Sequence, residues 1–184
     1  MRVEALTIAD VKVLTPARLG DDRGFLSEVY NRRTLAKLGI DTEFVQDNHS
    51  SSSRRGTVRG LHFQTPPRVQ VKLVRVVRGS AFDVAVDLRR GSPTYGRHVS
   101  IVLSAAAWNQ ILVPAGFAHG FMTLEPDTEV AYKVSDFHAA EHESGLAWND
   151  PLLAIRWPIT ESEAVLSDRD RGLPGFDGFS TPFE

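Results

Sequence analysis

The chain has 184 residues, of which 24% are charged and 42% hydrophobic, and these values predict a single soluble globular domain over residues 1–184. Its net charge of −2 and its pI near 6.3 argue against a nucleic-acid-binding protein and a membrane-surface binder, since both are usually strongly basic. The sequence has no cysteine, which excludes disulfide bonds and a thiol nucleophile.

The N-terminal stretch gives no sign of a targeting or membrane segment. Residues 1–6 lack an apolar signal core. No run in the chain approaches the roughly 20 apolar residues that a membrane-spanning helix needs. A cytoplasmic protein is the simplest interpretation.

One helix and several strands are predicted further along the chain. The helix covers residues 32–38, with Asn31 as its N-cap and Gly39 as its C-terminal stop. Alternating residue types predict strands at 70–79, 81–88, 97–103, 108–113 and 130–135. Many short strands at this spacing are typical of an all-β sandwich or barrel of the jelly-roll kind. Residues 166–184, which contain several glycines, are predicted to be a loop-like tail.

The run Ser50-Ser-Ser-Ser-Arg-Arg-Gly56 has two interpretations. It could be an RNA-binding or phosphorylated linker, or a polar loop that enters the next strand. The acidic protein and the absence of interleaved aromatic residues favour the polar loop.

Two separate segments, Gly56-Thr-Val-Arg-Gly-Leu-His-Phe-Gln64 and Pro114-Ala-Gly-Phe-Ala-His119, resemble the paired signatures of a cupin, a small β-barrel that often holds a metal. The first signature usually carries a second histidine where Gln64 stands, and no glutamate follows it over residues 65–68. Only His62 and His119 remain as ligand types, whereas a transition-metal site normally needs at least three protein ligands. The sequence therefore predicts a barrel without a metal, whose two histidines suit proton chemistry.

Nearly the whole chain resembles the dTDP-4-dehydrorhamnose 3,5-epimerase family of metal-free cupins. The matching pieces are Asp22-Arg-Gly-Phe25 with Glu28, Gln46-Asp-Asn48, Arg59-Gly-Leu-His62, Lys72-Leu-Val, Gly116-Phe-Ala-His-Gly-Phe121, Tyr132-Lys133, Trp148-Asn-Asp-Pro151 and Leu166-Ser-Asp-Arg-Asp170. One departure is Val71, which stands where the family often has glycine and is expected to narrow the pocket floor. The resemblance implies a cupin jelly-roll that inverts C3 and C5 of dTDP-4-dehydro-6-deoxy-D-glucose, giving dTDP-4-dehydro-L-rhamnose without a cofactor.

This reaction removes a C–H proton beside a ketone and returns a proton to the other face. His62 suits the base, because its unperturbed pKa lies near neutrality. The resemblance makes Asp170 the carboxylate that holds the imidazole in one tautomer. Lys72 offers a compact positive charge for the enolate oxygen, and Tyr132 is a weak acid that can protonate the carbanion.

The resemblance also implies a set of substrate-binding residues. Arg23 and Arg59 are expected to bind the diphosphate, since guanidinium pairs with phosphate oxygens in a bidentate way. Phe25 is expected to stack on thymine, and His119 to bond the sugar or share in proton relay. The remaining residues expected at the nucleotide end are Glu28, Gln46, Asp47 and Asn48, with Glu143 and Arg169 nearby.

Strand geometry places constraints on this set. Tyr132 shares a face with Val130 and Val134, so we expect an apolar barrel interior around it. Arg59 and His62, three positions apart, would face opposite ways in a regular strand. Either the backbone bulges near Gly60, or Arg59 serves a neighbouring subunit's site. Members of the family are homodimers that exchange N-terminal strands, and residues 3–13 could supply such a strand.

Three rival functions stay open. The first is an epimerase that acts at only one carbon of a dTDP-4-keto-deoxysugar for antibiotic biosynthesis, although the presence of both Lys72 and Tyr132 favours the double reaction. The second is a metal-dependent cupin, against which Gln64 speaks, and the third is a non-catalytic sugar-nucleotide binder. Each catalytic side chain also has a purely structural interpretation, such as a buried hydrogen-bonded histidine for His62 or a core phenol for Tyr132.

Overall fold

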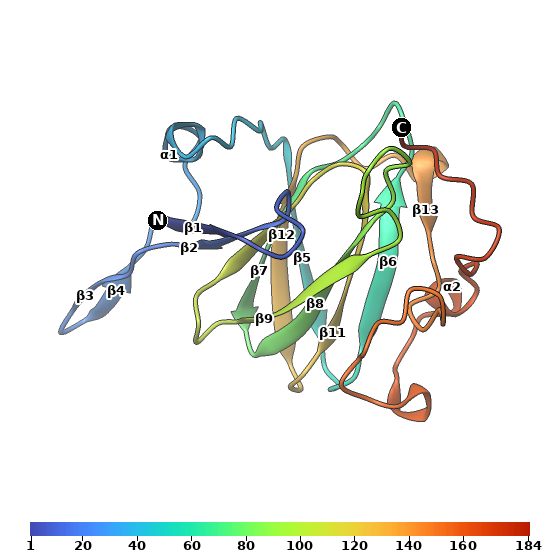
Figure 1. Ribbon diagram of the computed structural model, residues 1–184. Coiled ribbons are helices and arrows are strands. Elements are labelled where there is room, and N and C mark those ends of the chain that lie inside the picture. The colour runs from blue at the N-terminus through green and yellow to red at the C-terminus, as the bar shows by residue number, and fades with distance from the viewer.

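A computed structural model describes residues 1–184 as two antiparallel sheets that face each other, with a projecting arm at the N-terminal side (Figure 1). The first sheet has six strands, in the order β1 (Arg2–Ala5), β2 (Lys12–Thr15), β10 (Gln110–Val113), β7 (Lys72–Arg78), β12 (Thr128–Val134) and β5 (Gln46–Ser52). The second has five, in the order β13 (Glu143–Gly145), β6 (Val58–Gln64), β11 (Phe117–Thr123), β8 (Ser80–Asp87) and β9 (His98–Ser104). The predicted all-β jelly-roll is confirmed.

Both sheets send apolar side chains into the space between them. This central core contains Val74, Val76 and Val130 from the six-stranded sheet and Ala85, Val99, Leu103 and Phe121 from the five-stranded one. The alternation in β8 places Val84 and Val86 together on the opposite, outer face. There they are covered by the C-terminal part of the chain, including Leu146, Leu153 and Phe183.

The helices are short. The predicted N-terminal helix is confirmed as α1 (Arg32–Lys37), where the Asn31 side chain accepts hydrogen bonds from the backbone N–H groups of Arg33 and Thr34. Gly39 follows it with a φ of +78°, which suits glycine at a helix end. Neither α1 nor the four-residue α2 (Asp168–Arg171) has the length or apolar character to span a membrane.

Two predictions about loops need correction. Residues 166–184 are not entirely loop-like, because Ser167 caps α2 by accepting a hydrogen bond from the backbone N–H of Asp170. Ser50 to Ser52 belong to β5 rather than to a polar loop, since they pair with β12 as far as Thr128.

The predicted strand over 108–113 begins only at Gln110, because Trp108 has a φ of +58°. Short 3-10 helices at Ala140–His142 and Glu161–Glu163 complete the elements.

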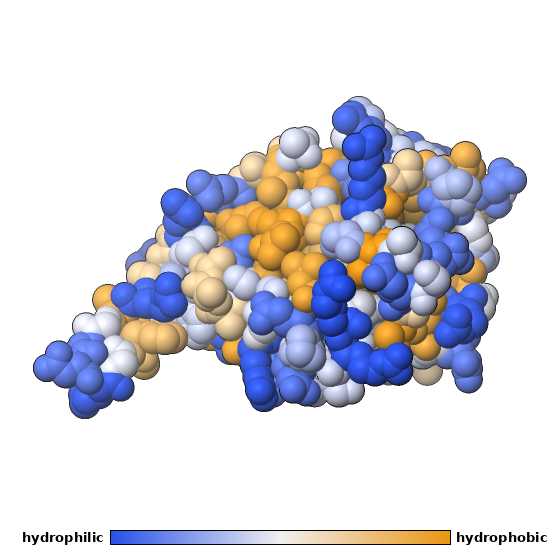
Figure 2. Space-filling view, turned by 90° about the horizontal axis from the view of Figure 1, so that it is seen from below, coloured by the Kyte–Doolittle hydropathy of each residue, from blue (hydrophilic) through white to orange (hydrophobic).

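The arm is the hairpin of β3 (Leu19–Asp21) and β4 (Gly24–Leu26), and it projects away from the body of the molecule (Figure 1). It exposes three large apolar side chains, with Leu19 at 70%, Phe25 at 51% and Leu26 at 74%. Figure 2 shows hydrophilic residues at its tip and apolar ones behind them. An arm this exposed buries little apolar surface within its own chain.

Candidate active site

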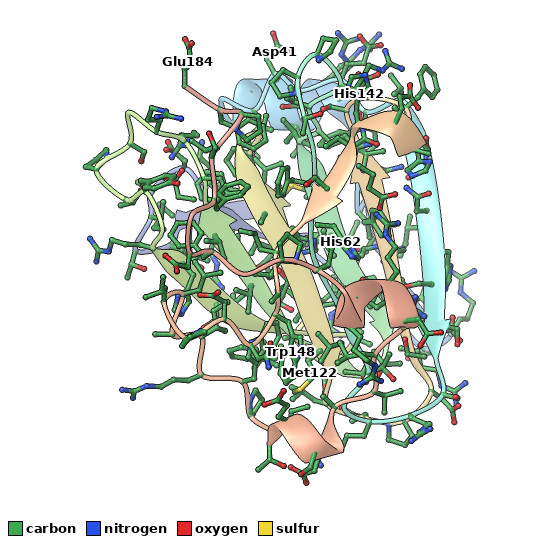
Figure 3. All side chains as sticks on the ribbon, turned by 90° about the vertical axis from the view of Figure 1, so that its right-hand side faces the viewer. Asp41, His62, Met122, His142, Trp148 and Glu184 are labelled. Carbon is green, nitrogen blue, oxygen red and sulfur yellow. The ribbon has the colours of Figure 1, made fainter.

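The candidate site is a cavity of about 310 Å³ between the two sheets. Figure 3 shows His62 in the middle of the barrel. The cavity is lined by Ser50, Arg59, His62, Lys72, His119, Phe121, Tyr132, Glu143, Ser167, Arg169 and Asp170. A smaller hollow of about 110 Å³ shares His62, Lys72, Tyr132 and Glu143 with it and is lined further by Gln46, Asn48 and Gln70 among others. All four side chains expected to do the chemistry therefore lie in one cavity.

A bulge in β6 brings Arg59 and His62 to the same cavity. His62 pairs with His119 of β11 and Arg59 pairs with Phe121, so two residues of β6 lie opposite Gly120 alone. Gly60, in the bulge, has a φ of +133°, and a Cβ there would lie 2.5 Å from the Cα of Gly120. Of the two alternatives, the structure has the bulge.

His62 and Asp170 form a close pair. The Nε2 of His62 lies 2.6 Å from Oδ1 of Asp170, which α2 holds against β6. Burial works to raise the pKa of Asp170, but the hydrogen bond and charge of His62 and the bond from Ser167 hold that pKa below its ordinary value. The carboxylate therefore stays ionised and holds the imidazole in one orientation.

Lys72 lies beside this pair without a carboxylate in contact. Its Nζ donates a hydrogen bond to the backbone oxygen of His62 at 3.3 Å. Desolvation lowers the pKa of Lys72 to about 8, against the opposing charges of Glu143 and Asp83. The ammonium is therefore largely charged at neutral pH, and no carboxylate forms a salt bridge with it.

Tyr132 enters the cavity from β12, packed against the central core. Burial raises the pKa of its phenol above the ordinary value, although the nearby Arg59 charge works against this. The phenol consequently keeps its proton at neutral pH. The predicted apolar surroundings are present on one side only, since Arg59 and Glu143 line the same cavity.

A second histidine–carboxylate pair lies beside the first, on the neighbouring strands β11 and β8. Its histidine was predicted from the sequence, and its carboxylate was not. The Nε2 of His119 lies 3.0 and 2.9 Å from the two oxygens of Asp83, a fully buried residue of β8. The signal was present in the sequence: Asp83 is an acidic residue on the inward face of an apolar strand. Its position fixes the imidazole and leaves the other ring nitrogen of His119 available.

Other predicted residues have partners of their own. Glu143 accepts hydrogen bonds from Arg169 at 2.8 Å and His138 at 3.1 Å, so it holds Arg169 at the edge of the cavity. Burial works to raise the pKa of Glu143, but these contacts keep that pKa below its ordinary value. Gln46 and Asn48 line the smaller hollow and bond each other at 2.9 Å.

Four predicted residues lie away from the cavity. Asp47 points to the opposite face of β5, as alternation requires, and pairs with Lys133 at 2.7 Å. Arg23 and Phe25 belong to the projecting arm, where Phe25 stacks edge-on against Trp108 at 4.9 Å. Glu28 accepts bonds from Asn31 and Thr34 near α1.

Gln64 and Val71 act as structural residues. The Gln64 amide donates to the backbone oxygens of Arg68 and Phe137 and accepts from the N–H of Ala139. No group of three or more histidine and carboxylate side chains is placed to hold a metal ion. Val71 packs under α1 and lines none of the described hollows, so the expected narrowing of the pocket floor does not occur.

Comparison with known proteins gives a consistent result. The family model of dTDP-4-dehydrorhamnose 3,5-epimerase matches residues 5–178. A protein of that name from Sinorhizobium fredii is 50% identical over 184 residues, covering 100% of this chain and 94% of the relative. The Bacillus anthracis enzyme with TDP and PPi bound superposes with a TM-score of 0.92 at 50% identity, covering 95% of this chain and 99% of that one. A Legionella pneumophila epimerase in complex with dTDP-4-keto-L-rhamnose gives 0.94 at 39% identity, covering 100% and 98%.

Proposed function

The chain belongs to the dTDP-4-dehydrorhamnose 3,5-epimerase family, and from this premise we propose how its own residues perform the reaction. The protein is an isomerase that inverts C3 and C5 of dTDP-4-dehydro-6-deoxy-D-glucose and yields dTDP-4-dehydro-L-rhamnose. Both carbons flank the C4 ketone, so each inversion is a proton removal followed by proton return to the opposite face. The observation that carries the assignment of the base is the 2.6 Å contact of His62 with Asp170 inside the cavity.

His62 is the base. One ring nitrogen is engaged by Asp170, and the other is free to take a proton from carbon. The ionised carboxylate of Asp170 stabilises the imidazolium that forms. The same base serves C3 and C5 in turn, because between the two steps it loses its proton to solvent and the acid on the opposite face takes one from solvent.

Lys72 stabilises the enolate oxygen that both steps share. Its ammonium lies beside the base, in a desolvated position where a charge interacts more strongly than in water. The second ring nitrogen of His119, positioned by Asp83, provides a further hydrogen-bonding group for the sugar.

Tyr132 donates its own phenolic proton to the carbanion from the opposite side. Its raised pKa keeps the phenol protonated until the carbanion forms. The six-stranded sheet supplies Tyr132 and the five-stranded sheet supplies His62, so acid and base reach the sugar from opposite walls of the barrel.

Arg59 and Arg169 bind the diphosphate, because they are the two arginines that line the main cavity. Gln46 and Asn48 bind the base edge, because the smaller hollow offers neutral amides rather than arginines. Glu143 positions Arg169 and also lines the cavity, where it can contact the substrate.

The arm completes the site of a second subunit. Arg23 and Phe25 lie on an exposed hairpin away from the cavity of their own chain, so they can contact substrate only in a partner's site. We therefore propose a homodimer, with Glu28 at the base of the arm. Within the single chain β1 pairs with its own β2, so exchange of the N-terminal strand stays a prediction. A cytoplasmic location also stays a prediction, and cell fractionation tests it.

The reaction itself is tested by incubating the enzyme with the dTDP-ketosugar in deuterated water and following the ring protons by NMR. Deuterium at both C3 and C5, with formation of the L-rhamno product, is expected. Label at one carbon alone would favour the single-carbon epimerase instead.

A further inference from the structure

Ser50 carries the only buried side-chain polar atom in the structure that has no hydrogen-bond partner. Native proteins pair nearly all such atoms, and leaving one unpaired costs free energy. The residue lines the same cavity as Arg59 and Tyr132. The hydroxyl therefore lies buried in the wall of the cavity, with no protein group to satisfy it.

Several neighbours of Ser50 along β5 have hydrogen-bond partners. Gln46 bonds Asn48 on the same inward face of the strand. Ser52, also inward, accepts a hydrogen bond at its Oγ from Nε of Arg59 at 3.2 Å, and the carbonyl oxygen of Ser51 accepts from the same guanidinium at 3.2 Å. These contacts hold Arg59 against the end of the strand, and the Ser50 hydroxyl beside them has neither a donor nor an acceptor partner.

The charge of the surroundings indicates what the hydroxyl binds. The main cavity holds two arginines, Arg59 and Arg169, whereas the smaller hollow holds none. Ser50 lines the main cavity only. An anion held by Arg59 has more acceptor sites than one guanidinium fills, and a serine O–H is a suitable additional donor.

We propose that Ser50 is a further substrate-binding residue, whose Oγ–H donates to a phosphate oxygen of the nucleotide diphosphate that Arg59 binds. This inference rests on the proposed function for its ligand. It does not depend on the roles of His62 or Tyr132, because it concerns binding of the diphosphate alone.

The substitution Ser50→Ala is a clean test. The hydroxyl has no partner in the protein, so its removal breaks no internal hydrogen bond and the melting temperature should hold. Ser100→Ala is the matched control, since Ser100 is an exposed serine on β9 outside the cavity. Affinities for dTDP and for thymidine are measured by calorimetry for both variants and the unmodified enzyme.

Ser50→Ala should weaken dTDP binding by about tenfold, or ~1.4 kcal/mol, and leave thymidine binding unchanged. The KM should rise while kcat at saturating substrate stays the same. Unchanged dTDP affinity would overturn the proposal. So would a fall in kcat with dTDP affinity intact, because the hydroxyl would then serve Tyr132 or the sugar. Failure of the epimerase assignment would appear separately, as absent turnover in the unmodified enzyme with dTDP binding preserved.

Discussion

His62 and His119 are direct neighbours across β6 and β11, and each imidazole has a carboxylate of its own at Nε2. The two carboxylates differ in origin: Asp170 comes from the short C-terminal helix α2, and Asp83 from the adjacent strand β8. Two oriented imidazoles thus meet at one cavity wall. The differences in their surroundings separate their roles, because only His62 also has the Lys72 ammonium bound at its backbone oxygen.

Tyr132→Phe should impair completion of the epimerisation more than the first exchange. The variant keeps the packing of the ring but loses the proton donor, so product formation should fall by about 10²–10⁴-fold. Deuterium should still enter recovered substrate, because His62 is untouched. NMR of substrate and product in deuterated water checks both quantities. Equal and negligible effects on exchange and product would contradict the role of the phenol.

Lys72 should give the enzyme an alkaline limit. Its pKa in the folded protein is about 8, below the ordinary lysine value, so its charge is present below that pH and is lost as pH rises through it. We therefore expect kcat to fall above about pH 8 with the stabilisation of the enolate. Lys72→Arg, if it retains activity, should move this limit to higher pH, because guanidinium stays charged. If kcat of that variant falls at the same pH as in the native enzyme, the alkaline limit belongs to a group other than Lys72.

The homodimer can be tested by complementation between two inactive variants. Arg23→Ala removes a residue of the arm, and His62→Ala removes the base. In a heterodimer of the two, one site combines the intact His62 of one chain with the intact Arg23 of the other. We expect about half of the native activity to return, as one of two symmetric sites is restored.

Differently tagged variants, purified as the mixed dimer, provide the measurement. Each variant purified alone is the control. No recovery in the mixed dimer would mean that the arm serves the site of its own chain or none.

Gly60→Ala should destabilise the protein and disrupt the site. An added Cβ would meet the Cα of Gly120 at 2.5 Å, and the φ of +133° disfavours alanine in addition. Gly24→Ala is a matched control, since Gly24 has a φ of +134° and nothing within 4 Å of the added Cβ. Thermal melting of both variants separates backbone strain from steric clash. An equal loss in the two would show that the contact with Gly120 is unimportant.

The sequence was most informative where burial follows local alternation. The strand β8 and the capping of α1 by Asn31 depend on periodicity and on a side chain a few positions away, and both were predicted. The bulge at Gly60 appeared only as one of two alternatives, because it depends on the close approach of Gly120 from another strand.

Other features could not be read from one chain. Arg23 and Phe25 lie on an exposed arm away from the cavity of their own chain, so no local pattern distinguishes these residues from ordinary surface. Asp83 and Ser50 are single polar residues whose significance depends on what lies opposite them in space. The α2 helix was not predicted, because it lies in a glycine-rich tail. It is stabilised by the Ser167 cap and by a few contacts with β6.

The most direct test of His62 as the base is solvent exchange with His62→Ala in deuterated water, with His49→Ala as the control. His49 lies outside the cavity and pairs with Glu129, so its removal should leave exchange unchanged. His62→Ala should bind dTDP and yet lose deuterium incorporation at both C3 and C5. Exchange at either carbon that continues at the native rate in His62→Ala would contradict the mechanism.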